Sequence, residues 1–178
     1  DMNSKQLTVL VIAALVLAPS ALAENGVQGK SPAQFCKNEL AALGLANFKS
    51  LYAPGGTGAN AMGKCVSKHA RAAAANRTNA AKTCKAEMAI PEAEFRAAHG
   101  GMSFAEFYGK NANDRNAYGK CVSSKATTAN AQQEAATMKA AKTCKAERAA
   151  DRTAFTARYG GKAASAFGKC VSSKSKRP

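Results

Sequence analysis

The chain has 178 residues, of which 26 are Lys or Arg and 11 are Asp or Glu, so its formal net charge is +15. It has no Trp, and Ala far outnumbers Leu and Ile after residue 22, which leaves little apolar area for one large core. Alternating and β-branched runs are absent, which excludes a β-sheet as the expected architecture. We therefore expect an all-α protein made of small helical units, each held by a disulfide.

Residues 1–23 have the pattern of a secretory signal peptide. Lys5 gives a positive start, Leu7 to Ala18 is an uncharged apolar run, and Ala21-Leu22-Ala23 is a small-residue cleavage motif. The run is shorter than the roughly 20 residues that a spanning helix needs. A buried core helix is the alternative, but it leaves the cleavage motif unexplained. We expect a secreted or cell-envelope protein that starts at Glu24 and has no transmembrane segment once the signal is removed.

Six cysteines follow the predicted signal: Cys36, Cys65, Cys84, Cys121, Cys144 and Cys170. An even number of cysteines in an exported chain predicts disulfides, here three. A zinc site usually needs close cysteine pairs such as C-x₂-C, but the shortest spacing here is 19 residues and the only histidines are His69 and His99. We therefore predict no metal site and no cofactor.

Three sequence blocks recur in the same order, which predicts three copies of one unit. The opening block Cys-Lys-Asn/Ala-Glu stands at 36–39, 84–87 and 144–147, and the closing block Gly-Lys-Cys-Val-Ser at 63–67, 119–123 and 168–172. Between them lies an aromatic pair four residues apart: Phe48/Tyr52, Phe104/Tyr108 and Phe155/Tyr159. We place the units at 24–75, 76–129 and 130–174, followed by a basic tail at 175–178.

Each unit is expected to contain three helical pieces. In the first copy the opening helix begins at the capping pattern Ser31-Pro32-Ala33-Gln34 and ends near Gly44. The second helix carries the aromatic pair, and Ser103 and Asp151 are its predicted caps in copies two and three.

The third piece follows a cap at Asn60, Asn116 or Ser165. Its repeated glycine (Gly63, Gly119 and Gly168) predicts a close backbone approach. Between the opening cysteine and the first aromatic residue of the pair, the second copy is nine residues longer than the third, within 91–103, and the third copy is also two residues shorter before its closing block. We expect loops to contain both differences.

The segments between units are free of Pro and rich in Ala, so we expect continuous helices from Ala61 to Met88 and from Ala117 to Ala149. At 1.5 Å per residue these would be roughly 40 to 50 Å long. The pairing expected within units is Cys36–Cys65, Cys84–Cys121 and Cys144–Cys170. The alternative places turns at 76–79 and 127–130, which would allow Cys65–Cys84 and Cys121–Cys144.

Catalysis has little support in the sequence, and we expect a protein that is not an enzyme. His69 and His99 have no equivalent in the third copy, and His69 lies one turn from a cysteine that a disulfide is expected to occupy. The glutamates that follow the opening cysteines, Glu39, Glu87 and Glu147, are expected in surface pairs or caps.

The distribution of charge is the sequence feature that indicates a function. Residues 24–83 carry 8 basic and 2 acidic residues, 84–143 carry 8 and 6, and 144–178 carry 9 and 2, so both ends are basic. We predict binding of anionic polymers or surfaces, such as nucleic acid or acidic envelope polymers. The predicted contacts are Lys64, Lys68, Arg71, Lys120, Lys125, Lys169, Lys174, Lys176 and Arg177. The alternative is a structural envelope protein whose units self-associate.

The stretch from Tyr108 to Ser123, which contains Tyr108-Gly109-Lys110 and Tyr118-Gly119-Lys120-Cys121-Val122-Ser123, resembles the F/Y-G-K-C-V-S repeats of uncharacterised secreted Ala/Lys-rich proteins of actinobacteria. The resemblance covers most of the chain after the predicted signal. It implies export and repetition, and it implies no activity.

Overall fold

The computed structural model describes residues 31–109, 115–160 and 163–176. Throughout these ranges the chain is helical, with short connections and no strand, so the predicted all-α class is confirmed. The predicted signal peptide at 1–23 lies outside the described residues, as do Arg177 and Pro178 of the predicted basic tail.

The helices fall into three groups along the chain. Unit 1 contains α1 (Pro32–Leu43), α2 (Leu45–Tyr52) and the first half of α3 (Ala61–Met88). Unit 2 contains the second half of α3, then α4 (Glu92–Ala98), α5 (Phe104–Gly109) and the first half of α6 (Ala117–Ala150). Unit 3 contains the rest of α6 with α7 (Arg152–Tyr159) and α8 (Ala163–Lys174).

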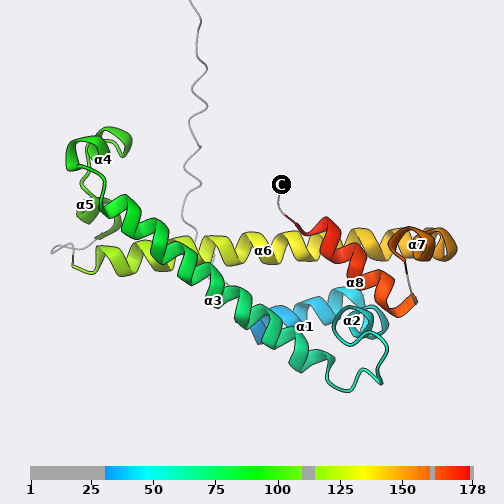
Figure 1. Cartoon of the computed structure of the whole chain (residues 1–178). Helices are drawn as coiled ribbons and strands as arrows, with labels where there is room; N and C mark the ends of the chain where they lie inside the picture. Colours follow the sequence, from blue (N-terminus) through cyan, green and yellow to red (C-terminus); the bar gives the residue numbers. More distant parts are fainter. Residues whose placement is uncertain (1–30, 110–114, 161–162, 177–178) are drawn as a thin grey trace, which may run out of the picture.

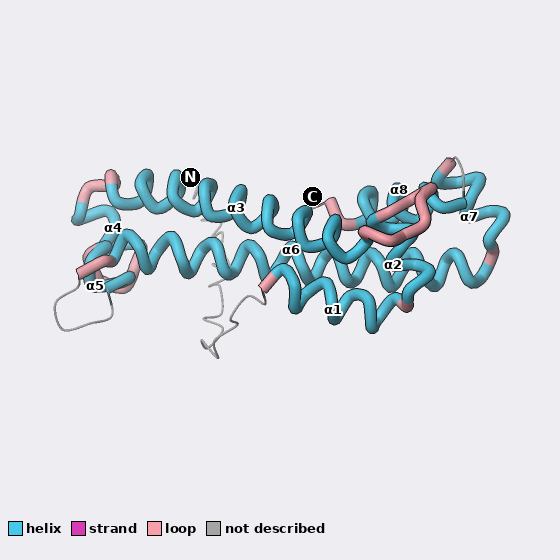
Figure 2. The backbone as a smooth tube through the Cα atoms, turned by 90° about the horizontal axis from the view of Figure 1, so that it is seen from below, coloured by secondary structure: helices cyan, strands magenta, loops and turns pink. Residues whose placement is uncertain are grey.

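Two long helices connect the units, as predicted. α3 has 28 residues and α6 has 34, and both pass without a turn through the expected unit boundaries at 75/76 and 129/130. They lie side by side in opposite directions, and α4 and α5 occupy the end where the chain doubles back (Figures 1 and 2). At their crossing Asn76 Nδ2 donates to Asn130 Oδ1 at 2.8 Å and to Gln133 Oε1 at 2.9 Å.

The predicted disulfides within units are confirmed. Cys36–Cys65, Cys84–Cys121 and Cys144–Cys170 each join the opening helix of a unit to its closing helix. The alternative pairing needed turns within α3 and α6, and these are absent because neither helix is interrupted.

Three of the predicted caps form side-chain hydrogen bonds, whereas Asn60 and Asn116 stand at the starts of α3 and α6 without one. Ser31 Oγ accepts from Gln34 N at the start of α1, and Asp151 Oδ1 accepts from Ala154 N at the start of α7. α5 begins with a reciprocal capping box, in which Ser103 N donates to Glu106 Oε2 and Glu106 N donates to Ser103 Oγ. The cap predicted at Ser165 is wrong, because α8 already begins at Ala163.

The extra residues of unit 2 form a helix, whereas the sequence led us to expect loops. Helix α4 presents Phe95, which is 2 % exposed, to the aromatic cluster of α5. The Phe95 ring lies 5.6 Å from the Phe104 ring and 6.2 Å from the Phe107 ring, centroid to centroid. The insertion therefore supplies unit 2 with an aromatic cover of its own.

Units 1 and 3 share one core, which the sequence did not predict. Phe48 of α2 and Phe155 of α7 belong to the same buried cluster as Phe167 of α8, together with both disulfides of these units. Ala140 and Ala141 of α6 also belong to it, because only a small side chain allows the surrounding helices to approach the α6 backbone. Unit 2 has a separate, smaller cluster around Cys84 and Cys121.

The repeated glycines do not share one surrounding. A β-carbon on Gly168 would lie 3.8 Å from the carbonyl oxygen of Leu51, an ordinary contact distance, so α8 packs against the end of α2 there without requiring a glycine. At Gly63 the β-carbon would instead meet the side-chain oxygen of Asn60 at 2.6 Å, and at Gly119 it would collide with Asn116. In those two copies the glycine makes room for the asparagine that precedes its own helix.

Candidate functional site

Each unit joins the tyrosine of its second helix to the glutamate of its opening helix. The hydroxyls of Tyr52, Tyr108 and Tyr159 donate to Oε2 of Glu39, Glu87 and Glu147, at 2.5, 2.8 and 3.0 Å. The signal for this contact was the recurrence of the glutamate and of the tyrosine in every copy, although 12 to 21 residues separate them along the chain. It was missed because the sequence does not show which helix faces are brought together.

A lysine four residues after the closing cysteine completes this arrangement in units 2 and 3. Lys125 Nζ lies 2.8 Å from Glu87 Oε1, and Lys174 Nζ lies 2.9 Å from Glu147 Oε1. Burial alone would raise the pKa of Glu87, but hydrogen bonds from Lys125 and Tyr108 hold that pKa below its usual range. The positive charges of these two lysines are thus largely balanced inside the units.

Unit 1 has His69 at the equivalent position, in a buried setting. His69 is 7 % exposed and Glu39 is fully buried, so the expected surface role of Glu39 is wrong. The Tyr52 hydroxyl lies 3.1 Å from His69 Nε2 while it donates to Glu39. A neutral imidazole can be buried at lower cost than an ammonium, which explains why histidine replaces lysine here.

Burial shifts the ionisation of this buried cluster. Desolvation raises the pKa of Glu39, against the opposing effects of the Tyr52 hydrogen bond and the Lys68 charge. Desolvation, with the Lys68 charge added, lowers the pKa of His69 to about 4. Desolvation and the neighbouring Glu39 raise the pKa of Tyr52. His69 is therefore neutral at physiological pH.

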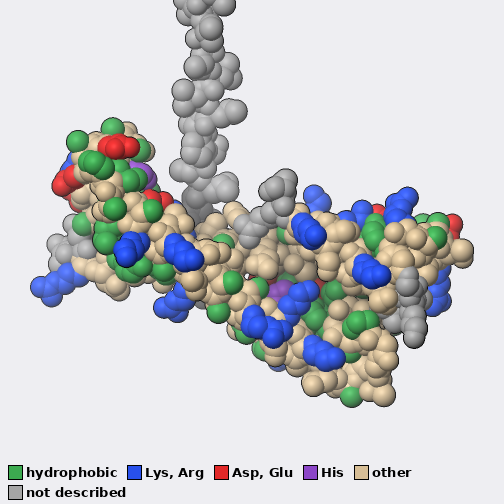
Figure 3. All heavy atoms as spheres, viewed as in Figure 1, with side chains coloured by type: hydrophobic (Ala, Val, Ile, Leu, Met, Phe, Trp, Pro, Cys, Tyr) green, Lys and Arg blue, Asp and Glu red, His purple; other side chains and the backbone are tan. Residues whose placement is uncertain are grey.

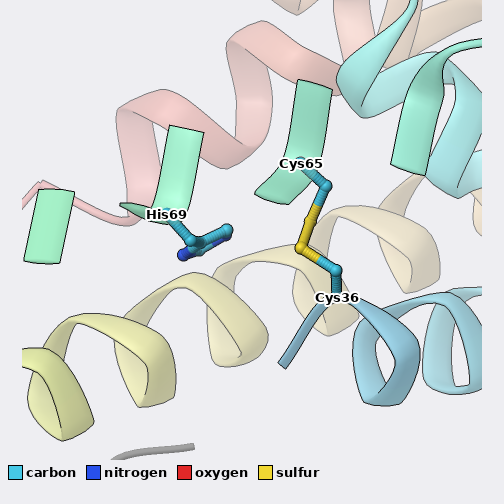
Figure 4. Close-up of side chains that lie close together, drawn as sticks. All are labelled: Cys36, Cys65 and His69. Carbon is cyan, nitrogen blue, oxygen red and sulfur yellow. A yellow bond between two sulfur atoms is a disulfide. The ribbon is translucent and has the colours of Figure 1, made fainter. Parts of the chain in front are cut away.

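The Cys36–Cys65 disulfide lies beside His69 (Figure 4). One ligand-type atom from each of the three residues lies within 4.8 Å of the other two, and Cys65 Sγ is 3.6 Å from Glu39 Oε2. While the two sulfurs are bonded to each other, neither is a thiolate that could attack a substrate or bind a metal.

The sequence-predicted cations Lys64, Lys68 and Arg71 come together on one surface. They line a groove of about 520 Å³ between α2 and the first turns of α3. We call this the basic groove, and its remaining lining residues are Leu51, Tyr52, Asn60, Gly63 and Ser67. All three cations are exposed, and the Lys68 ammonium lies 5.6 Å from the centroid of the Tyr52 ring.

The lysine before the closing cysteine behaves differently in unit 1. In units 2 and 3, Lys120 Nζ donates to the carbonyl oxygen of Gly109 and Lys169 Nζ to that of Gly160, at the end of the second helix. No such bond holds Lys64 within the described residues, so its ammonium stays at the basic groove. The three equivalent lysines are thus used in two ways.

The other predicted contacts are dispersed. Lys125 and Lys174 are paired with glutamates, and Lys176 is exposed near the end of α8, while Arg177 lies outside the described residues. In the view of Figure 3, Lys and Arg gather over the first half of α3 and over unit 3, whereas the acidic side chains are most concentrated around α4. The structure therefore brings together Lys64, Lys68 and Arg71 and separates the remaining candidates.

Among the described residues, no helix combines the length and the apolar character that crossing a membrane requires. No protein-family model, curated protein or solved structure matches the chain.

Proposed function

We propose that the protein is a secreted, non-enzymatic binder of anionic polymers, and that the basic groove is its principal contact. The observation that carries this proposal is the convergence of Lys64, Lys68 and Arg71 on one groove. Within the described residues, none of the three forms an ion pair with a carboxylate. Their charges are therefore available to a ligand, unlike those of Lys125 and Lys174.

The chemistry of the groove suits repeated phosphate, sulfate or carboxylate groups. Lys64, Lys68 and Arg71 follow one another at about one turn of α3, so they form a row along the helix. Asn60 and Ser67 add neutral donors between the cations. A row of charges on a rigid helix matches an extended polyanion and reads little of its sequence.

Binding to duplex DNA and to a sulfated glycan tests this proposal, with neutral dextran as the control polymer. The protein should be oxidised and should lack residues 1–23. We expect it to bind both polyanions at low salt, to bind more weakly near 0.15 M ionic strength, and not to bind dextran. Absence of binding at low salt would contradict the proposal.

Two triple variants with the same net charge locate the surface. Lys64→Gln/Lys68→Gln/Arg71→Gln removes the cations of the basic groove. Lys82→Gln/Lys85→Gln/Lys142→Gln removes three exposed lysines elsewhere on α3 and α6. We expect the first variant to lose most of the affinity and the second to retain it. Equal losses would show that the protein binds by overall charge and not through the groove.

One observation favours self-association as a second function. Phe167 of unit 3 is fully buried, and beside it α8 packs on α2, but the equivalent Tyr118 of unit 2 is 39 % exposed. Tyr118 and Met88, which is 54 % exposed, flank an apolar groove of about 460 Å³. Because one unit already packs on another within the chain, we propose a second copy of this chain as the occupant of that groove.

Sedimentation velocity at high salt, over a wide range of protein concentration, tests this second function. Self-association through an apolar face should persist at high salt and should be abolished by Tyr118→Lys. A protein that remains monomeric at every concentration would contradict it, and association that high salt abolishes would point to charge.

A further inference from the structure

The surroundings of the first disulfide have the composition of a zinc site. Zinc in proteins is bound by thiolate sulfur, imidazole nitrogen and carboxylate oxygen in a tetrahedral arrangement. Cys36, Cys65 and His69 offer two sulfurs and a nitrogen within 4.8 Å of one another, and all three side chains are buried. Cys65 and His69 stand one turn apart on the same face of α3, opposite Cys36 of α1 (Figure 4).

Glu39 lies beside this group of three, which does not include its carboxylate. It follows Cys36 by one turn of α1, and its Oε2 is 3.6 Å from Cys65 Sγ. Its other oxygen, Oε1, is buried and has no hydrogen-bond partner among the described residues. A buried carboxylate oxygen without a partner is costly, and a cation would satisfy it. Tyr52 can keep its bond to Oε2 and so orient the carboxylate.

We propose that the chain binds one Zn²⁺ through Cys36, Cys65 and His69 when the first disulfide is reduced, and that the adjacent Glu39 carboxylate turns toward the metal as the fourth ligand. Two thiolates and one carboxylate carry three negative charges, so a bound Zn²⁺ leaves a net charge of −1. The Lys68 ammonium, whose charge already acts on Glu39, offsets this remainder.

The metal-bound form and the disulfide exclude each other. Reduction requires two electrons and two protons, which two molecules of a small thiol supply as they form their own disulfide, and it leaves Cys36 and Cys65 as thiols. Zinc binding then releases both thiol protons to water. The site would thus hold α1 against α3 in a chain whose first disulfide is open.

Units 2 and 3 cannot form the same site. Their residues equivalent to His69 are Lys125 and Lys174, whose ammonium groups have no lone pair for a metal. Each ammonium also forms a salt bridge with the glutamate that corresponds to Glu39. The two other cysteine pairs of the same chain are therefore internal controls for the first.

Cysteine alkylation of the reduced full chain tests the proposal. The protein is reduced, freed of reductant without oxygen, given one equivalent of Zn²⁺ and treated with iodoacetamide, and each cysteine is followed by mass spectrometry. We expect Cys36 and Cys65 to lose their reactivity, while Cys84, Cys121, Cys144 and Cys170 react as they do without zinc. Equal protection of all six cysteines, or of none, would overturn the proposal.

Substitution of His69 separates a built site from incidental thiolate binding. His69→Lys gives unit 1 the residue that units 2 and 3 have, and it should abolish zinc protection of Cys36 and Cys65. The matched control His99→Lys changes the other histidine and should keep that protection. Protection that survives in His69→Lys would overturn the site. If reduction unfolds the chain, circular dichroism replaces alkylation as the readout, and helix recovery on zinc addition must depend on His69.

Discussion

The Tyr52 hydroxyl donates a 2.5 Å hydrogen bond to a Glu39 carboxylate that is wholly buried, and the Tyr–Glu pairs of units 2 and 3 repeat this contact nearer the surface. The contact connects the second helix of each unit to its opening helix, beside the disulfide. In unit 1 the Tyr52 hydroxyl also lies 3.1 Å from His69 Nε2, and Lys68, the residue before His69, lines the basic groove.

Tyr52→Phe should lower the free energy of unfolding by about 1 to 3 kcal/mol, because it leaves a buried carboxylate oxygen without its donor. Tyr159→Phe is the matched control. Glu147 is partly exposed and keeps its Lys174 partner, so we expect a loss below about 1 kcal/mol. Urea denaturation of the oxidised proteins measures both. Equal losses would show that burial of Glu39 does not strengthen the contact.

His69 should make the protein less stable in acid. Its pKa falls to about 4 in the folded chain, against about 6.5 in an unfolded one, so the unfolded chain binds more protons between these values. Stability from this residue is therefore complete above about pH 6.5 and is lost as the pH falls toward 4. Glu39, whose pKa is raised, acts in the opposite direction and stabilises the fold as the pH falls.

The comparison of wild type with His69→Gln isolates the histidine, because Glu39 remains in both proteins. The difference in unfolding free energy should shift in favour of the variant as the pH is lowered from 7 to 4. A difference that stays constant with pH would mean that His69 titrates alike in the folded and unfolded chains.

Phe167→Ala should cost about 3 to 5 kcal/mol, since this fully buried ring belongs to the core that units 1 and 3 share. Tyr118→Ala changes the equivalent position of unit 2, where the ring is 39 % exposed, and should cost much less. Thermal unfolding of both variants checks the difference. Similar losses would argue against the packing of unit 3 on unit 1.

Removal of the first disulfide should destabilise helices of two units, whereas removal of the second should destabilise its own unit. Each disulfide closes a loop of 26 to 37 residues, which corresponds to about 3.5 to 4 kcal/mol in the chain-entropy description. Cys36→Ala/Cys65→Ala should speed amide hydrogen exchange in both α2 and α8, because these helices pack together. Cys84→Ala/Cys121→Ala should speed exchange in α5 and spare α8. Identical exchange maps for the two variants would contradict a shared core of units 1 and 3.

Local signals in the sequence were sufficient for most of the helices. Ala-rich segments without Pro predicted α3 and α6 to within one residue, and the capping residues Ser31, Ser103 and Asp151 marked three helix starts. The disulfide pairing followed from the repeated blocks, because a continuous connecting helix separates Cys65 from Cys84 along its axis.

Local sequence signals could not predict the contacts between segments that are far apart along the chain. Nothing local in Phe167 or Ala141 indicates that α6 and α8 enclose a core together with α2. Glu39 and Glu87 stand at the same position of the opening block, three residues after its cysteine, and the packing of unit 1 against α6 distinguishes them. For the same reason the sequence indicated nine cations as candidate contacts without showing which of them lie together, and the fold brings together three of them.

The salt dependence of DNA binding tests the basic groove most directly. Each phosphate contact contributes about 0.9 to the slope of log K against log salt, so Lys64→Gln/Lys68→Gln/Arg71→Gln should make that slope shallower by about 2.7. The control Lys82→Gln/Lys85→Gln/Lys142→Gln should keep the wild-type slope at the same net charge. Equal slopes for the two triple variants would contradict the account, because binding would then follow total charge and not the groove between α2 and α3.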